Sequence, residues 1–210
     1  MAAFEGPGRE DPERESTVDG RPGGSAVPTL PSDALPARGE VEETARSRIE
    51  SLEFRRALGR FASGITVITT EHEGAVHGMT ANAFVSVSLD PPLVLVSVDN
   101  RAKMNEILPV SGHYGVSILR DSQEDLSQHF AGRPKEGTVV SFARRGGVPL
   151  LEGALAHLVC RLVDVHPAGD HTLYIGHVEY LDYGDGAPLL YYTGAYRCLE
   201  VQLWDHGYIW

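Results

Sequence analysis

The sequence predicts a mainly β fold, an antiparallel barrel that is closed or nearly closed, with a few short helices. Several segments have the β-branched or alternating composition of strands, and short turns separate most of them. The regular alternation of strands and helices that builds parallel sheets is missing. No GxGxxG motif follows the first strand, so a Rossmann dinucleotide domain is not the predicted fold.

The composition of the 210-residue chain, 42% hydrophobic and 22% charged, is that of a globular domain with an appendage. No run approaches the roughly twenty apolar residues of a membrane helix. The first residues lack the basic and apolar segments of a secretory signal. We therefore expect a cytoplasmic protein without a membrane partner. The net charge of -11 repels phosphate backbones, which argues against a nucleic-acid partner.

Residues 1–46 are predicted to be a disordered tail, because they are rich in proline, glycine and charge and contain a single aromatic residue, Phe4. A docking arm for a partner is the alternative. The folded domain is expected over residues 47–200. The last ten residues, 201–210, form an aromatic C-terminal tail that holds both tryptophans.

A first helix is predicted over residues 48–61. Ser47 and Glu50 have the spacing of a capping box, and an apolar stripe starts at Phe54 and continues four and seven residues later. Two more short helices are predicted over 102–108 and, after a second capping-box pair at Asp121 and Glu124, over 121–129.

The remaining pattern indicates strands and turns. Residues 83–89 alternate valine with serine, which is typical of a half-buried strand, whereas 93–98 is apolar nearly throughout and is expected to be buried on both faces. Residues 131–149 are rich in Gly, Pro and Arg and are expected to form a long loop. The other strands are predicted over 65–70, 76–81, 114–119, 154–165, 172–182 and 189–192, with a turn at 73–74.

The two cysteines, Cys160 and Cys198, have no spacing that suggests zinc, and no metal is expected. We expect both to be buried, reduced thiols, with a disulfide as the alternative.

Residues 78–98 read GMTANAFVSVSLDPPLVLVSV, and GDHTLYIGHVEYL follows at 169–181. These stretches resemble the flavin reductase-like family, and the resemblance continues over 115–132, 147–165 and 188–199. It implies a Greek-key FMN-binding split barrel that dimerises, with the flavin in a groove near the dimer interface. It also implies FMN or FAD as the flavin, NADH or NADPH as the hydride donor, and a separate monooxygenase that receives reduced flavin.

The resemblance places flavin-binding residues at Thr80, Ala81, Asn82 and Ala83. Small side chains there let backbone N–H groups approach the polar edge of the ring, where negative charge arrives on reduction. A tightly packed strand is the alternative. His171, after Gly169 and Asp170, is the expected catalytic residue, and its imidazole would orient the nicotinamide.

The family also places an aromatic loop beside the flavin, here Phe130, Ala131 and Gly132, although Phe130 could equally close its own helix. Tyr196 could reach the pocket from a neighbouring subunit. The flavin phosphate is expected at residues 99–103, where Ala102 and Met104 replace two hydroxyl residues of the family pattern. Each lost hydrogen bond to a charged group costs about 1.5–3 kcal/mol. The residues expected to bind there are Asp99, Asn100, Arg101, Ala102 and Lys103.

These features predict an NAD(P)H:flavin oxidoreductase that supplies a partner monooxygenase. Two alternatives remain: a flavin-dependent oxygenase or other redox enzyme with its own organic substrate, and a non-catalytic flavin-binding protein. The altered phosphate run adds weight to both alternatives, although it also fits a reductase that holds flavin loosely as a substrate, which is the interpretation we favour. The retained histidine at 171 argues against a pure binding protein.

Overall fold

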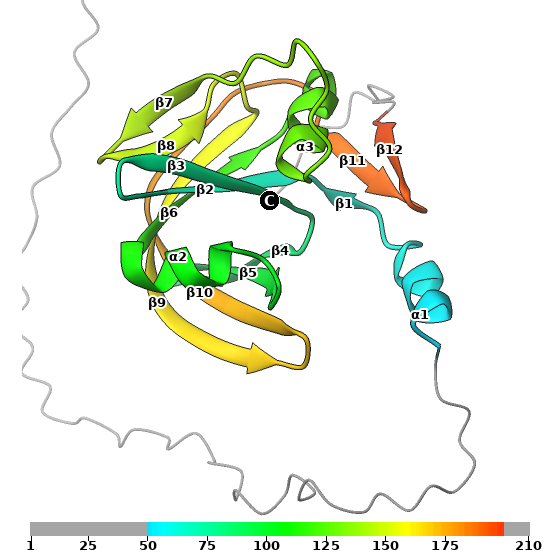
Figure 1. The fold of residues 1–210 in the computed structure, drawn as a ribbon, viewed down its shortest axis with the longest axis horizontal. Coiled ribbons are helices and arrows are strands. Elements are labelled where there is room, and N and C mark those ends of the chain that lie inside the picture. Colours follow the sequence, from blue (N-terminus) through cyan, green and yellow to red (C-terminus); the bar gives the residue numbers. More distant parts are fainter. Residues whose placement is uncertain (1–49, 200–210) are drawn as a thin grey trace, which may run out of the picture. The chain divides into compact units, whose positions relative to one another are not determined.

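The computed structural model describes residues 50–199, and the predicted tails at 1–46 and 201–210 lie outside them. One antiparallel sheet, in the order β3-β2-β6-β9-β10-β5-β4, dominates the described part (Figure 1). The strands are β2 (Thr66–His72), β3 (Ala75–Ala81), β4 (Phe84–Leu89), β5 (Pro92–Asp99), β6 (His113–Ile118), β9 (Ala156–Ala168) and β10 (His171–Tyr183). The predicted mainly β, antiparallel fold is confirmed.

The two edges of this sheet are strands that follow one another in the chain. β3 and β4 are not paired, and only Asn82 and Ala83 connect them. A link from Ala81 to Phe84 spans at most about 11 Å, so the sheet must curl until its edges nearly meet. The result is a barrel with an opening between β3 and β4. Asn82 and Ala83 lie at that opening, and the Ala83 carbonyl accepts the Ser97 N–H of β5 over 3.0 Å.

The main core lies inside the curled sheet. Val94, Val96 and Val98 of β5 are buried there, together with Tyr114 of β6 and Tyr174 of β10. The alternate β5 side chains are only partly buried, so the expectation of burial on both faces is wrong.

β4 presents its valines to the outside. Phe84 packs against the core, whereas Val85, Val87 and Leu89 are 56%, 49% and 91% exposed. The alternation correctly predicts a strand, but its apolar face is the uncovered one. A bulge between Ser86 and Ser88 shifts the register of this strand against β5.

Two smaller sheets flank the barrel (Figure 1). The first contains β1 (Ser63–Gly64), β11 (Leu189–Tyr192) and β12 (Ala195–Cys198). The second is a hairpin of β7 (Phe142–Arg145) and β8 (Val148–Leu151), which corrects the long loop expected over 131–149. Its turn is Gly146-Gly147, both with positive φ (56° and 84°), the two-residue turn that matches strand twist.

The helices differ from the predicted ones at their ends. They are α1 (Ser51–Leu58), α2 (Met104–Ser111), the 3-10 turn η2 (Asp121–Gln123) and α3 (Glu124–Phe130). The predicted Asp121–Glu124 capping pair is replaced: the Gln123 side chain accepts the Arg120 backbone N–H over 3.0 Å. Ser47 lies outside the described residues. No helix within 50–199 is long and apolar enough to cross a membrane.

The cysteines have different surroundings. Cys160 is buried in the core, but Cys198 is exposed, which corrects the expectation of two buried thiols. Cys198 ends β12 in the small sheet, where its side chain is not covered by the described part of the chain. Both are free.

Candidate functional site

A groove runs beside the opening of the barrel. It consists of two adjoining cavities of about 660 Å³ and 580 Å³ that share Leu58, Phe61 and Asn82. The larger cavity extends along β1 and the start of β4. The smaller one reaches Asp170 and His171, where β10 begins. Residues far apart in the sequence therefore line one continuous space.

The apolar wall of the groove consists of side chains from α1 and from the segment that follows this helix. Phe54, Leu58 and Phe61 line it, and they are 53%, 57% and 80% exposed. The sequence shows this stripe but does not reveal its role, because an amphipathic helix usually buries its apolar face. Here no residue of α1 is buried, and the stripe faces a cavity instead of a core.

Asn82 and Ala83, predicted to bind flavin, line the groove. Thr80 and Ala81, the other two residues of this stretch, lie behind it. The Ala81 carbonyl accepts the Thr66 hydroxyl over 2.8 Å, and the Thr80 hydroxyl donates to the Ser127 carbonyl over 2.7 Å. Both bonds fix the end of β3, so they support the two residues that follow.

α3 and β12 pack behind this strand. The Ser127 and Tyr196 hydroxyls lie 2.8 Å apart, and Tyr196 and Phe130 pack in a second core cluster. Phe130 also lies over Gly78, where an added Cβ would be 2.5 Å from the ring. Phe130 therefore closes its own helix. Ala131 and Gly132 are exposed beyond α3 and, like Phe130 and Tyr196, do not line the groove.

The predicted catalytic histidine sits against the predicted phosphate run. His171 is the register partner of Asp99 across the β5–β10 ladder. The Asn100 N–H donates to the Asp170 carbonyl over 3.0 Å, and the Thr172 hydroxyl donates to the Asn100 side chain over 2.8 Å. The turn at 169–171 and the start of the run at 99–103 thus form one unit, of which Asp170 and His171 line the groove and residues 99–103 do not.

His171 is held by its neighbour. Its Nδ1 lies 2.7 Å from Asp170 Oδ1, and this hydrogen bond lowers the pKa of Asp170. A carboxylate acceptor favours the tautomer that carries a proton on Nδ1. The Asp170 contact therefore fixes the imidazole and leaves Nε2 as the acceptor.

The guanidinium of Arg101 is already paired with the Asp99 carboxylate. Its Nε and Nη2 donate to the two Asp99 carboxylate oxygens over 3.0 Å and 2.6 Å, and these bonds hold the pKa of Asp99 well below its usual range. Ala102 is partly buried and packs against the core. Lys103 is exposed and has no carboxylate within ion-pair distance in the described residues. Among the basic side chains of this run, Lys103 is the free one.

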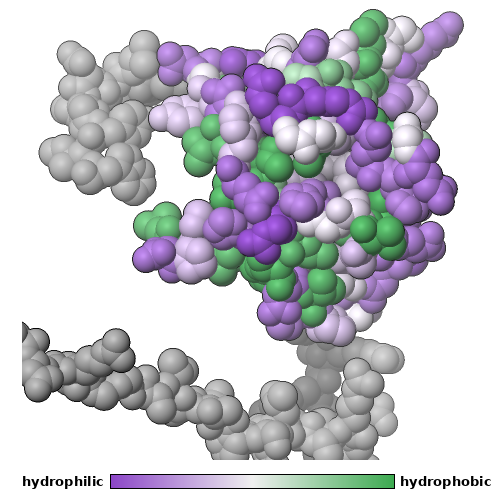
Figure 2. Space-filling model, turned by 90° about the vertical axis from the view of Figure 1, so that its left-hand side faces the viewer, coloured by the Kyte–Doolittle hydropathy of each residue, from purple (hydrophilic) through white to green (hydrophobic). Residues whose placement is uncertain are grey.

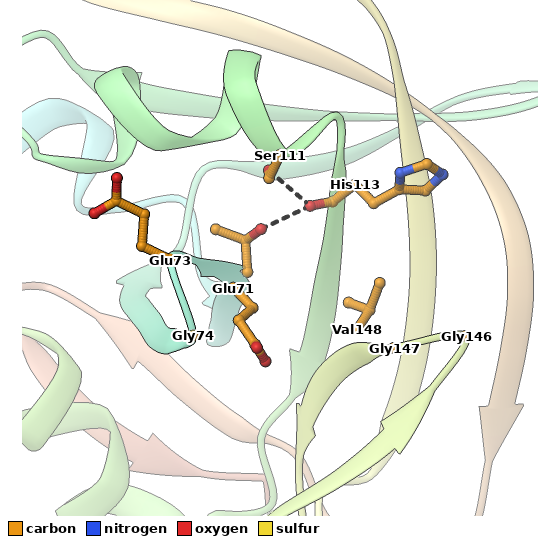
Figure 3. A pocket seen from close by; sticks show the side chains of 9 residues that line it. Glu71, Glu73, Gly74, Ser111, His113, Gly146, Gly147 and Val148 are labelled. Carbon is orange, nitrogen blue, oxygen red and sulfur yellow. Dashed lines mark hydrogen bonds between the residues drawn. The ribbon is translucent and has the colours of Figure 1, made fainter.

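A further cavity, of about 400 Å³, lies on another face of the barrel. Figure 2 shows hydrophilic residues over much of the face that carries the β2–β3 turn and the β7–β8 hairpin. The Thr70 and Ser111 hydroxyls both donate to the backbone carbonyl of His113 (Figure 3). The imidazole of His113 points away from Glu71. No predicted site residue lines this cavity, so the groove is the better candidate.

The model of the flavin reductase like domain family matches residues 58–200. The chain belongs to this family. The match includes both sides of the groove opening and the 169–171 turn, and it confirms the family predicted from the sequence.

Several relatives of this flavin reductase-like protein have names. An NADH-dependent flavin reductase of a Rhodococcus species is 60% identical over 73% of this chain and 89% of its own length. The reductase component of 4-hydroxyphenylacetate 3-monooxygenase of Thermus thermophilus is 47% identical, over 70% and 95%. The solved structure of flavin reductase PheA2 is 48% identical, covers 73% of this chain and all of its own, and has a TM-score of 0.71.

Proposed function

We propose that this protein is an NADH-dependent flavin reductase, which transfers a hydride from NADH to FMN or FAD and supplies reduced flavin to a separate monooxygenase. The observation that carries the proposal is the groove that joins Asn82 and Ala83 to His171. The names of the relatives support the donor and the partner, since they include an NADH-dependent reductase and a monooxygenase component. The expected cytoplasmic location stays a prediction.

The groove suits a flavin. The isoalloxazine ring has one polar edge and one apolar end, and the groove is lined both by Asn82 and Ala83, which lie between β3 and β4, and by apolar side chains of α1. Its two cavities are within the roughly 300–1,000 Å³ of ordinary ligand sites. Lys103 is the cation for the flavin phosphate. Loss of the family's hydroxyl residues at 102 and 104 suits a flavin that binds loosely and leaves after reduction.

When bound, the flavin supplies the acceptor for a hydride from the reduced nicotinamide. The residues of the chain position the reactants. His171, fixed by Asp170, accepts a hydrogen bond from the nicotinamide carboxamide at Nε2 and so orients the ring. The N–H groups of Asn82 and Ala83 would donate to the polar edge of the ring, which gains negative charge on reduction.

In this proposal the protein acts as a homodimer. Val85, Val87 and Leu89 form an apolar strip on the outer face of β4 that no described element covers. A second copy of the chain is the occupant, and Val85, which also lines the groove, puts the site at the border of this interface. A Val87→Lys variant should therefore elute as a monomer in size-exclusion chromatography, whereas a dimeric variant would place the interface elsewhere.

The activity is tested by mixing the purified protein with NADH and either FMN or FAD under anaerobic conditions. We expect the nicotinamide absorbance to fall only when flavin is added, and more slowly with NADPH. Tight flavin binding without oxidation of either nicotinamide would contradict the proposal.

A further inference from the structure

A cluster of arginines adjoins the groove at the end of α1. Arg55, Arg56 and Arg60 line a cavity of about 390 Å³ together with the turn at Thr193-Gly194. Arg55 also lines the groove cavity that contains Asp170 and His171. This arginine cavity is therefore next to the end of the groove where the proposed function puts the nicotinamide.

The arginine cavity has a fixed frame. The Thr193 N–H donates to the Gly59 carbonyl over 2.8 Å, which ties the end of α1 to the β11–β12 turn. Thr193 and Gly194 both have positive φ, 51° and 79°, and a Cβ at Gly59 would lie 3.1 Å from the Arg55 carbonyl oxygen. The end of α1, which carries the arginines, is thus tied to the β11–β12 turn by a backbone hydrogen bond.

The charges of the cluster are uncompensated within residues 50–199. Arg101, Arg144 and Arg161 each form an ion pair with a carboxylate, but Arg55, Arg56 and Arg60 form none there. The whole chain has a net charge of -11, so three neighbouring free guanidinium groups are a local exception. Guanidinium donors match the paired oxygens of phosphate groups, so the chemistry of this cavity suits an anion.

We propose that Arg55, Arg56 and Arg60 bind the diphosphate of the nicotinamide dinucleotide. One ribose separates the nicotinamide ring from the diphosphate, so an anion site that shares Arg55 with the cavity of His171 has the required proximity. The flavin phosphate has its own cation in Lys103, on a different element. This inference rests on the proposed function and adds to it the site that recognises the phosphate-bearing half of the donor.

The test compares two hydride donors, NADH and N-benzyl-1,4-dihydronicotinamide, which has no phosphate. In an Arg56→Gln/Arg60→Gln variant we expect the KM for NADH to rise at least about tenfold, because charged hydrogen bonds to phosphate are lost. The rate with the phosphate-free donor and the KM for flavin should not change. Arg55→Gln should also raise the KM for NADH. Arg145→Gln, which removes an exposed arginine on β7, is the matched control and should leave both donors unaffected.

Three outcomes would overturn the inference. They are an unchanged KM for NADH, an equal loss with both donors, and a rise in the KM for flavin in place of that for NADH. A wild-type protein that oxidises the phosphate-free donor but not NADH would overturn it as well. Failure of the wild type with both donors would overturn the proposed function itself, so the two failures can be told apart. Unfolding temperatures of the variants, whose side chains are exposed, verify that the fold is retained.

Discussion

His171 and Asp99 are direct partners across the β5–β10 ladder. In the proposed function, this pairing joins the turn that would orient the hydride donor to the run that would meet the flavin phosphate. Asn100 strengthens the connection, since its backbone and side chain bond to the 169–171 turn and to Thr172. Under the proposed function this unit would position both substrates, and a displacement of either stretch must move the other.

Lys103 should contribute more to flavin binding than Arg101. Lys103→Ala should raise the flavin dissociation constant at least about tenfold, because it removes the free cation of the run. Arg101→Ala should have a smaller effect, since the guanidinium is already bonded to Asp99. Titration of flavin fluorescence measures both constants. An equal or larger effect of Arg101→Ala would show that the Asp99 pair opens for the ligand.

Only one thiol should react in the native protein. Burial raises the pKa of Cys160 to about 12, so its thiol stays protonated at pH 7–9 and becomes a thiolate only near or above pH 12. Cys198 is exposed and free. Alkylation at pH 8 followed by mass spectrometry should find one modified cysteine, at position 198, and two after denaturation. Fast modification of Cys160 in the native state would contradict its burial.

Gly176 makes room for Tyr114 in the core. A Cβ at position 176 would overlap the Tyr114 hydroxyl, and Gly176→Ala should therefore lower the free energy of unfolding by about 1–3 kcal/mol. The hydroxyl itself is buried without a hydrogen-bond partner among the described residues, so Tyr114→Phe should not destabilise. Urea unfolding tests both changes. The double variant Gly176→Ala/Tyr114→Phe should recover part of the lost free energy of unfolding. If the effects of the two changes simply added, the proposed contact between Gly176 and Tyr114 would be contradicted.

Tyr196 should act on stability and not on substrate binding. Its hydroxyl bonds to Ser127 within the same chain, so Tyr196→Phe should cost about 1 kcal/mol in the free energy of unfolding. The KM for NADH should stay the same, because Tyr196 does not line the groove. A clear rise in this KM would instead support the family-based expectation that this ring reaches the pocket of a neighbouring subunit.

The sequence predicts most strands because their alternation depends on local composition. It does not predict which face meets the core, and the valines of β4 are exposed although their pattern is that of a half-buried strand. For the same reason, the sequence does not predict that Phe54 and Leu58 line the groove and do not pack in the core. The Gly146-Gly147 pair is typical of a two-residue hairpin turn and could have predicted β7 and β8. The Gly, Pro and Arg content of the surrounding segment predicted a loop instead.

The site was predictable in its parts but not in its assembly. The motifs at 80–83 and at 169–171 are visible in the sequence, and Asn82, Ala83 and His171 do line the groove. That Asp99 would neutralise Arg101 depends on side-chain geometry, which no spacing rule gives. The pairing of position 99 with 171 depends on the strand order of the sheet, which includes contacts between distant segments.

The most direct test of the account is the effect of His171→Ala on NADH oxidation with saturating flavin under anaerobic conditions. We predict that kcat/KM for NADH falls about a hundredfold, while the flavin dissociation constant changes little, because His171 orients the nicotinamide. His166→Ala, an exposed histidine of β9, is the control and should be fully active. A His171→Ala variant as active as the wild type would contradict the account, because the nicotinamide would then be bound elsewhere.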